Sequence, residues 1–185
     1  MDGVDIKDYD LKALRNKLGY ISQKAVLFSG SVKENLVLGE NGKAVPTNDE
    51  LDEALSIACA DFVENMEGGK DAYISQGGTN VSGGQKQRLS IARGLARKPE
   101  ILIFDDTFSA LDYKTDKKLR NNLKTYLSDA TKLIVAQRIG TIKDCDQIIV
   151  LDEGKIVGKG KHKDLLETCE VYKEIALSQL SKEEL

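Results

Sequence analysis

Val81-Ser82-Gly83-Gly84-Gln85-Lys86-Gln87-Arg88 is the stretch that decides the fold of this chain of 185 residues. It ends a glycine-rich segment and continues into good helix formers, which stop before Pro99. The amino terminus of a helix carries unpaired N–H groups and the positive end of the helix dipole, so it can hold a phosphate. The same residues also fit a plain serine-capped helix after a turn, and the stretch alone leaves both interpretations open.

A short apolar segment, Ile101-Leu102-Ile103-Phe104, follows one helix length later and ends in Asp105-Asp106. Carboxylates at the carboxyl end of a strand face the ligand crevice of an open α/β sheet, where they can hold Mg²⁺ directly or through water. Residues 133–136 and 148–151 are further apolar segments, and they alternate with helical patterns. This alternation predicts an α/β fold with a mostly parallel sheet.

Composition disfavours several classes of function. The 27 basic and 30 acidic residues give a net charge of −3, which argues against a nucleic-acid-binding protein. The single histidine, His162, cannot supply a histidine triad or a histidine metal cluster, and we expect it to be a turn or cap residue. The three cysteines are widely spaced, as expected of reduced thiols. Any catalysis must therefore use carboxylates, amides, hydroxyls and backbone donors.

The stretch around Ser82, the strand that ends in Asp105 and the directly following Ser109-Ala110-Leu111-Asp112 together resemble the nucleotide-binding domain of ATP-binding cassette (ABC) transporters. Phe28-Ser29-Gly30-Ser31-Val32-Lys33-Glu34-Asn35-Leu36 is similar to a segment of exporter-type members. The resemblance covers essentially the whole chain. It implies a P-loop NTPase (RecA-like) core with a mostly parallel sheet and an inserted helical subdomain.

The resemblance implies roles for individual residues. It implies ATP and Mg²⁺ as cofactors, with Asp105 as the Walker B aspartate at the metal and the Q-loop residue Gln23 acting on the metal indirectly. Asp106 and Gln137 occupy the positions of the catalytic carboxylate and the switch residue. The signature loop, which binds nucleotide in trans, is matched by Ser82, Gly83, Gly84 and Gln85. The D-loop is matched by Ser109 and Asp112.

Three departures from the family pattern bear on activity. No Gly-x-x-x-x-Gly-Lys-[Ser/Thr] occurs in the 185 residues, so we expect the domain to lack its first strands and its Walker A phosphate loop. Asp106 replaces the usual glutamate and is one methylene shorter than a general base at that position. Gln137 replaces the usual histidine and cannot carry a proton. We therefore expect the isolated chain to bind nucleotide weakly, to be inactive as an ATPase and to expose a sheet edge or an apolar face.

These departures resemble the degenerate half of heterodimeric exporters. They imply an exporter domain that couples ATP binding and hydrolysis to transmembrane transport, with a degenerate site of its own and a signature loop that acts in trans. The implied partners are a second ABC ATPase domain, bound head to tail, and the transmembrane domain of an exporter, with no nucleic acid. The implied location is the cytoplasmic face of the membrane, with the domain itself soluble. Alternatives are a non-enzymatic interaction module that pairs with another ATPase domain and, less favoured, a DNA-repair or chromosome ATPase.

The resemblance also implies domain boundaries, and local patterns add finer predictions. The expected parts are a core of residues 1–26 and 98–160, a helical signature subdomain of residues 27–97 and a C-terminal helix of residues 161–185. Lys86, Arg88 and Arg93 of the signature helix fit either phosphate steering or a solvated helix face. Helix caps are predicted at Asp10, Ser31, Thr47 and Asp112.

Overall fold

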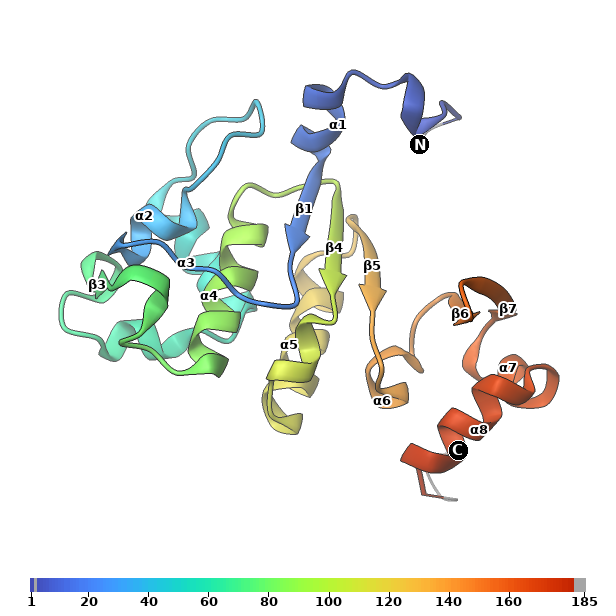
Figure 1. The fold of residues 1–185 in the computed structure, drawn as a ribbon. Coiled ribbons are helices and arrows are strands. Elements are labelled where there is room, and N and C mark those ends of the chain that lie inside the picture. Colours follow the sequence, from blue (N-terminus) through green and yellow to red (C-terminus); the bar gives the residue numbers. More distant parts are fainter. Residues whose placement is uncertain (2, 182–185) are drawn as a thin grey trace. The chain divides into compact units, whose positions relative to one another are not determined.

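The chain folds as two units, Met1–Val135 and Ala136–Leu185, and the computed structural model describes residues 1 and 3–181 (Figure 1). The elements of the first unit are η1 (Ile6–Asp8), α1 (Leu11–Lys17), β1 (Leu18–Ile21), β2 (Gly30–Ser31), α2 (Val32–Leu36), α3 (Asn48–Ile57), η2 (Asp61–Asn65), η3 (Gly69–Asp71), β3 (Tyr73–Ile74), η4 (Gln76–Gly78), α4 (Gly83–Ala96), β4 (Ile101–Asp105), η5 (Thr107–Ala110), α5 (Tyr113–Tyr126) and β5 (Thr131–Val135), where η marks a 3₁₀ helix. Those of the second unit are α6 (Ile139–Ile142), β6 (Ile148–Asp152), β7 (Lys155–Gly160), α7 (His162–Thr168) and α8 (Glu170–Gln179).

Side-chain caps begin helices at the residues where the sequence predicts them. Each capping oxygen accepts a hydrogen bond from the backbone N–H three residues later, which satisfies a donor that helix geometry leaves unpaired. At α2, α3 and α4 the glutamate or glutamine at that third position also closes the reciprocal bond. The capping residues are Asp10, Ser31, Thr47, Ser82 and Asp112.

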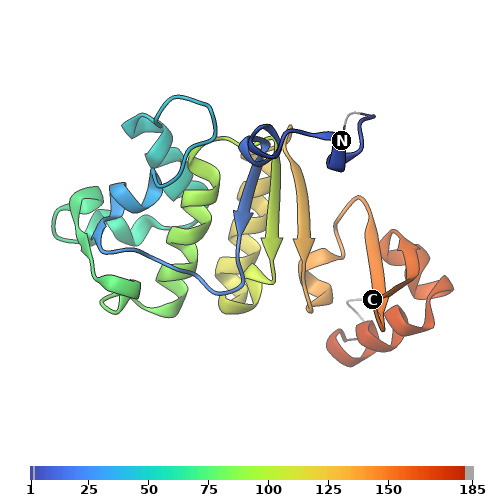
Figure 2. The ribbon, with the colours of Figure 1, turned by 45° about the horizontal axis from the view of Figure 1, so that its top comes forward.

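Three parallel strands form the main sheet of the first unit, in the order β1-β4-β5 (Figure 2). Their register aligns Tyr20, Ile103 and Leu133 in one row across the sheet. Because successive side chains alternate between the faces, Ile21 and Phe104 of the next row point the other way. Both are fully buried, in one apolar cluster with side chains of α4 and α5. The predicted α/β fold with a mostly parallel sheet is therefore confirmed.

The opposite face of this sheet carries exposed apolar side chains. Tyr20 is 60% exposed, Leu133 is 53% exposed and Val135 is 49% exposed. An apolar sheet face of this kind is more typical of a surface that another segment covers than of one that faces water. The exposed apolar face expected from the sequence is thus present, and association of the chain through it stays a prediction.

Glycines allow α4 to lie very close to β1. A Cβ atom at Gly94 would come within 2.7 Å of Cγ1 of Ile21, which is closer than two carbon atoms can approach. A Cβ atom at Gly19 would lie 2.8 Å from the carbonyl oxygen of Gly94. The helix and the strand therefore meet backbone to backbone, and this contact sets where the chain leaves β1 beside α4.

The second unit packs the antiparallel hairpin of β6 and β7 with α7 and α8 around a small apolar cluster. The sequence predicts one helix over residues 161–185, but the structure has two. Cys169, between α7 and α8, is extended (φ −128°, ψ 104°) and buried, so the chain turns there and both helices reach the cluster. Residues 182–185 of the expected helix lie outside the described residues.

Neither unit holds a helix, among residues 1 and 3–181, that is both long and apolar enough to cross a membrane. The finer division into a core of residues 1–26 and 98–160, a helical subdomain of residues 27–97 and a C-terminal part stays a prediction.

Adding one methyl group at Gly94 tests the contact between α4 and β1. We expect Gly94→Ala to lower the free energy of unfolding of the first unit by about 1–3 kcal/mol, because Ile21 must move to admit the new atom. Gly84→Ala is the matched control, since a Cβ there meets no atom within 4 Å. The control should change stability by less than about 1 kcal/mol, in the stabilising direction. Urea unfolding followed by circular dichroism measures both, and equal effects would contradict the close contact.

Candidate functional site

Asp105, the first carboxylate at the end of β4, is held from the neighbouring strand. The hydroxyl of Tyr20 on β1 donates to Oδ2 of Asp105 at 2.7 Å. This hydrogen bond raises the pKa of Tyr20, and burial and the carboxylate's charge add to the effect. The phenol therefore stays protonated as a donor at neutral pH and holds one oxygen of Asp105 in place.

Asp106, the second carboxylate, has a strained backbone and is only 8% exposed. Its φ of 45° and ψ of 30° lie in the left-handed region, which costs a residue with a β-carbon about 1–2 kcal/mol. Its N–H donates to the carbonyl oxygen of Val135 at 3.0 Å, and its carbonyl oxygen accepts from Oγ of Ser109 at 2.7 Å. Its Oδ2 accepts from Nε2 of Gln23 at 2.9 Å. The structure thus brings together three residues that the sequence singles out, Gln23, Asp106 and Ser109.

Thr107 completes this turn, and no sequence pattern identified it. Its Oγ1 donates to the carbonyl oxygen of Ile21 at 3.1 Å, and both residues are fully buried. The bond ties the end of β1 to the turn after β4. The only sequence feature that pointed to Thr107 is its place after two aspartates, and that feature is equally typical of an ordinary polar turn.

Asp112 acts within the chain as the cap of α5. Its Oδ1 accepts from the N–H of Thr115 at 2.9 Å, and its Oδ2 accepts from Oγ1 of Thr115 at 2.7 Å. These two hydrogen bonds, that of the hydroxyl first, lower the pKa of Asp112. The carboxylate is therefore charged at neutral pH at the surface beside the turn.

The signature stretch lies at the amino terminus of α4. Oγ of Ser82 accepts from the N–H of Gln85 at 3.2 Å, and Oε1 of Gln85 accepts from the N–H of Ser82 at 2.8 Å. The serine uses its oxygen in this cap and keeps its proton as a donor. A Cβ atom at Gly83 or Gly84 would meet no atom within 4 Å, so packing within the chain does not require either glycine. Both interpretations of this stretch, a helix cap and an anion site, therefore fit one geometry.

Two arginines of α4 contact backbone carbonyls inside the first unit. Nη1 of Arg88 donates to the carbonyl oxygen of Cys59 at 2.9 Å, and its guanidinium lies 4.9 Å from the ring centre of Phe62. Nη2 of Arg93 donates to the carbonyl oxygen of Val26 at 2.9 Å. A fully solvated helix face is therefore wrong for these two side chains, because backbone carbonyls beside α4 take up their donors. Phosphate steering stays a prediction.

Gln137 belongs to the second unit. Its carbonyl oxygen accepts from Nε2 of Gln179 on α8 at 2.8 Å, and Oε1 of Gln179 accepts from the N–H of Ile139 at 2.8 Å. Gln179 therefore holds the backbone at the expected switch residue, and Gln137 itself is exposed. A role for its side chain at a phosphate stays a prediction.

His162, the first residue of α7, is part of the packing of the second unit. Its Nδ1 lies 2.7 Å from the hydroxyl of Tyr172, and its Nε2 is buried with no hydrogen-bond partner in the described part of the chain. Burial raises the pKa of Tyr172 to about 12, so the phenol donates and Nδ1 accepts. Burial, and then the charge of Lys143, lower the pKa of His162, with Lys163 acting in the same sense and Asp144 opposing. The expectation of a turn or cap residue is therefore wrong, because Lys161 is the N-cap of α7 and His162 packs inside the helix start against Tyr172.

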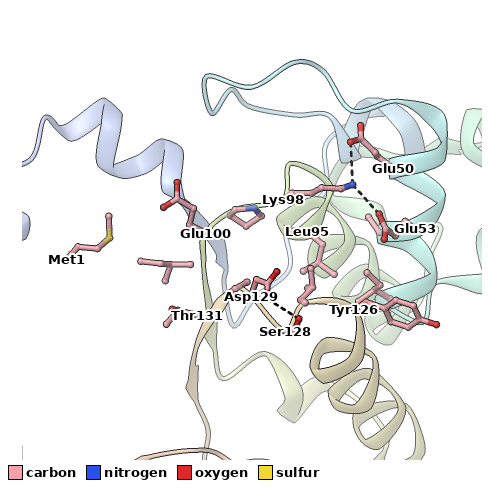
Figure 3. A pocket seen from close by; sticks show the side chains of 16 residues that line it. Met1, Glu50, Glu53, Leu95, Lys98, Glu100, Tyr126, Ser128, Asp129 and Thr131 are labelled. Carbon is pink, nitrogen blue, oxygen red and sulfur yellow. Dashed lines mark hydrogen bonds and ion pairs between the residues drawn. The ribbon is translucent and has the colours of Figure 1, made fainter.

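A hollow of about 560 Å³ lies away from these groups, at the amino ends of β4 and β5 (Figure 3). Lys98 on its rim lies 3.4 Å from an oxygen of Glu50 and 3.3 Å from an oxygen of Glu53. Lys98 thus already neutralises Glu50 and Glu53, two of the carboxylates that line the hollow. The hollow lies at the amino ends of the strands, whereas Asp105 and Asp106 lie at the carboxyl end of β4, so a ligand in the hollow would not reach them.

The residues present fit a magnesium ion that is held mainly by a nucleotide. The side chains of Asp105 and Gln23 carry oxygen atoms of the kind that Mg²⁺ prefers as ligands. Among residues 1 and 3–181, no group of three histidine, cysteine or acidic side chains is arranged to hold a metal. Mg²⁺ usually keeps several waters and binds one or two carboxylates together with phosphates, so a single aspartate at a strand end suffices.

Fold and site together define an α/β protein with a parallel sheet, two carboxylates at the end of β4 and a helix, α4, that follows a glycine-rich segment. A family model described as ABC transporter matches residues 1–109. A Mycobacterium tuberculosis protein named as an uncharacterized ABC transporter ATP-binding protein is 46% identical over 180 residues, which are 97% of this chain and 31% of that protein. Multidrug resistance protein 1 of Entamoeba histolytica is 38% identical over 186 residues, which cover 100% of this chain and 14% of that protein.

A solved structure of a bacterial Atm1-family ABC exporter with ATP bound also matches, with a TM-score of 0.89 and 36% identity. The match covers 98% of this chain and 32% of that one. This chain belongs to the ABC transporter family, and its identification as a nucleotide-binding domain of that family is confirmed. It spans about a third of the length of the mycobacterial relative and of the solved exporter.

Acid should destabilise the second unit through His162. Its pKa is lowered in the folded state from 6.5, so the unfolded chain binds more protons below that pH and stability is lost as the pH falls. We expect the unfolding midpoint to drop more between about pH 7.5 and about pH 5.5 in the wild type than in His162→Gln, which cannot take up the proton. Thermal unfolding at both pH values measures this, and equal acid sensitivity of the two proteins would contradict it.

Proposed function

We propose that the chain forms part of the ATP-binding domain of an ABC exporter, and that its signature loop completes a nucleotide site on a second ATPase domain. The observation that carries the proposal is the amino terminus of α4, where Gly83 and Gly84 face open space. Helix geometry leaves their N–H groups unpaired, and the dipole of the 14-residue helix favours an anion there. A phosphate carried by the partner domain would accept from these groups and from the hydroxyl of Ser82.

The chain's own carboxylate at the catalytic position supports a degenerate site. Oδ2 of Asp106 already accepts from Gln23, and the short side chain starts from a backbone fixed on both sides by Val135 and Ser109. A general base must come within about 2.6–3.2 Å of the proton that it removes. In this proposal Asp106 serves as an acceptor that holds the Q-loop, and hydrolysis takes place at the partner's site.

Asp105 and Gln23 would hold Mg²⁺ in this arrangement, and Tyr20 would keep the Asp105 carboxylate oriented. The ion, when bound, neutralises charge that develops on the phosphates. The hydrogen bond from Tyr20 restricts rotation of the Asp105 carboxylate, so a ligand of the metal is already oriented before the ion binds.

The remaining partners follow from the exporter assignment. Closure of two such domains around nucleotide would move a transmembrane domain, with the ATP-binding domains at the cytoplasmic face of the membrane. The alternative of a non-enzymatic module that only pairs with another ATPase domain uses the same signature loop. It differs in predicting no change of the partner's ATP hydrolysis when this chain binds.

Calorimetric titration of MgATP into the chain of 185 residues tests its own site. The sequence has no phosphate-loop motif among these residues, so we expect no binding up to the millimolar range. Binding in the micromolar range would contradict the expectation drawn from the missing phosphate-loop motif, because it would require phosphate contacts other than those described above.

A trans-complementation assay tests the signature loop. The probe is an ATP-binding domain of a related exporter that carries its own phosphate loop and catalytic glutamate, with its ATP hydrolysis followed while this chain is added. We expect the wild type to raise the rate about tenfold or more, and Gly84→Ala to lose the gain because the methyl group occupies the phosphate position. Gly140→Ala is the matched control in open space on α6 and should act like the wild type. A rate unaffected by the wild type, or equally raised by Gly84→Ala, would overturn the role in trans.

A further inference from the structure

Residues 22–29 connect β1 to β2 without regular secondary structure, and we call this segment the strap. Figure 1 shows it as the blue segment that runs from the end of β1 past α4 to α2. Because the strap is not paired in a sheet or helix, its backbone N–H and carbonyl groups need hydrogen-bond partners from other parts of the chain. Two side chains of α4 donate to strap carbonyls: Nε2 of Gln87 to that of Ser22 at 3.3 Å, and Nη2 of Arg93 to that of Val26 at 2.9 Å. The N–H of Gly77 donates to the carbonyl of Leu27 at 3.1 Å. The side-chain amide of Asn35 pairs with both the N–H and the carbonyl of Phe28, each at 2.8 Å.

Arg93 is the charged member of this set. It forms none of the ion pairs found among residues 1 and 3–181. Burial lowers the pKa of Arg93, and its Nη1 is buried with no hydrogen-bond partner among the described residues. A half-buried guanidinium without a carboxylate is costly, so the charge-assisted hydrogen bond to Val26 is the contact that retains it there.

The strap leads from this contact directly to the candidate site. Gln23 stands three residues before Val26, and its side chain donates to Asp106 at 2.9 Å. On the other side of Gln23, Thr107 holds the carbonyl of Ile21 at 3.1 Å. The position of Gln23 is therefore set by Thr107 on the turn after β4 and by two side chains of α4, Gln87 at Ser22 and Arg93 at Val26.

We infer that Arg93 is a positioning residue, which fixes the strap at Val26 and so holds Gln23 against Asp106. Arg93 donates to Val26 and Ser90, so it acts on Gln23 through the strap. Because Gln23 and Asp106 matter as members of the nucleotide site, this role rests on the proposed function. It adds a mechanical link between the signature helix and the Q-loop within one chain.

The chemistry of the guanidinium suggests the variant to make. Nη2 of its planar guanidinium donates to the carbonyl of Val26 at 2.9 Å and, at 3.5 Å, to Oγ of Ser90. Lysine keeps the charge and loses the fork. Arg97→Lys is the matched control, because Arg97 lies near the end of the same helix and donates from Nη2 to the carbonyl of Val37 at 2.8 Å, outside the strap.

Hydrogen exchange measured by NMR on the chain of 185 residues tests the inference. The readouts are the side-chain amide of Gln23, assigned through its loss in Gln23→Leu, and the backbone amide of Gly77, which donates to Leu27. We expect Arg93→Lys to speed exchange at both about tenfold or more relative to amides of α5, and Arg97→Lys to leave both unchanged. If Arg93→Lys unfolds in buffer, the measurement is made in sucrose, which strengthens burial.

Unchanged exchange in Arg93→Lys, or an equal change in Arg97→Lys, would overturn the positioning role. So would a uniform acceleration that includes the amides of α5, since that is the mark of a general packing residue. The experiment contains no nucleotide and no partner domain. If Arg93→Lys speeds exchange but the trans-complementation assay is negative, the positioning role stands and the proposed function falls. If exchange is unchanged but trans-complementation succeeds, the proposed function stands and the positioning role falls.

Discussion

The candidate site depends on the pairing of β4 in parallel with β1 on one side and β5 on the other. Parallel strands end at the same edge, so Gln23, Asp106 and the carbonyl of Val135 meet there although they are far apart in the chain. The hydrogen bonds at this edge then hold Asp106 in a left-handed backbone that it would not adopt alone. A shift of β1 by one residue would separate Gln23 from the carboxylate and turn Tyr20 away from Asp105.

Local features were predictable from the sequence, and features that depend on register were not. The caps at Ser31 and Thr47 are encoded within four residues, so their patterns predicted them correctly. The bond between Tyr20 and Asp105 joins residues 85 apart and exists only in one alignment of β1 and β4. The contact of Arg93 was missed for a related reason, because a basic residue on a helix gives no sign of which carbonyls lie beside it. The break at Cys169 was missed because cysteine is not a helix breaker and tertiary packing decides the turn.

Stability and site chemistry use the same side chains in the first unit. Thr107 and Ser109 bond to backbone carbonyls, yet they also define the turn that presents the two aspartates. Asp112 caps α5 at the position where the sequence predicts a D-loop residue. Residues with such double roles couple folding to site geometry, so the turn cannot relax without loss of the helix start that follows it.

The capping box of α4 has a consequence for how an anion would be met. Ser82 and Gln85 close it by reciprocal hydrogen bonds, so the backbone at Gly83 and Gly84 is ordered before any ligand arrives. Glycine loses more conformational freedom on becoming ordered than any other residue. Here that loss belongs to the folding of the helix and not to association, so a phosphate would meet a preorganised receptor and the docking step would carry little entropic penalty.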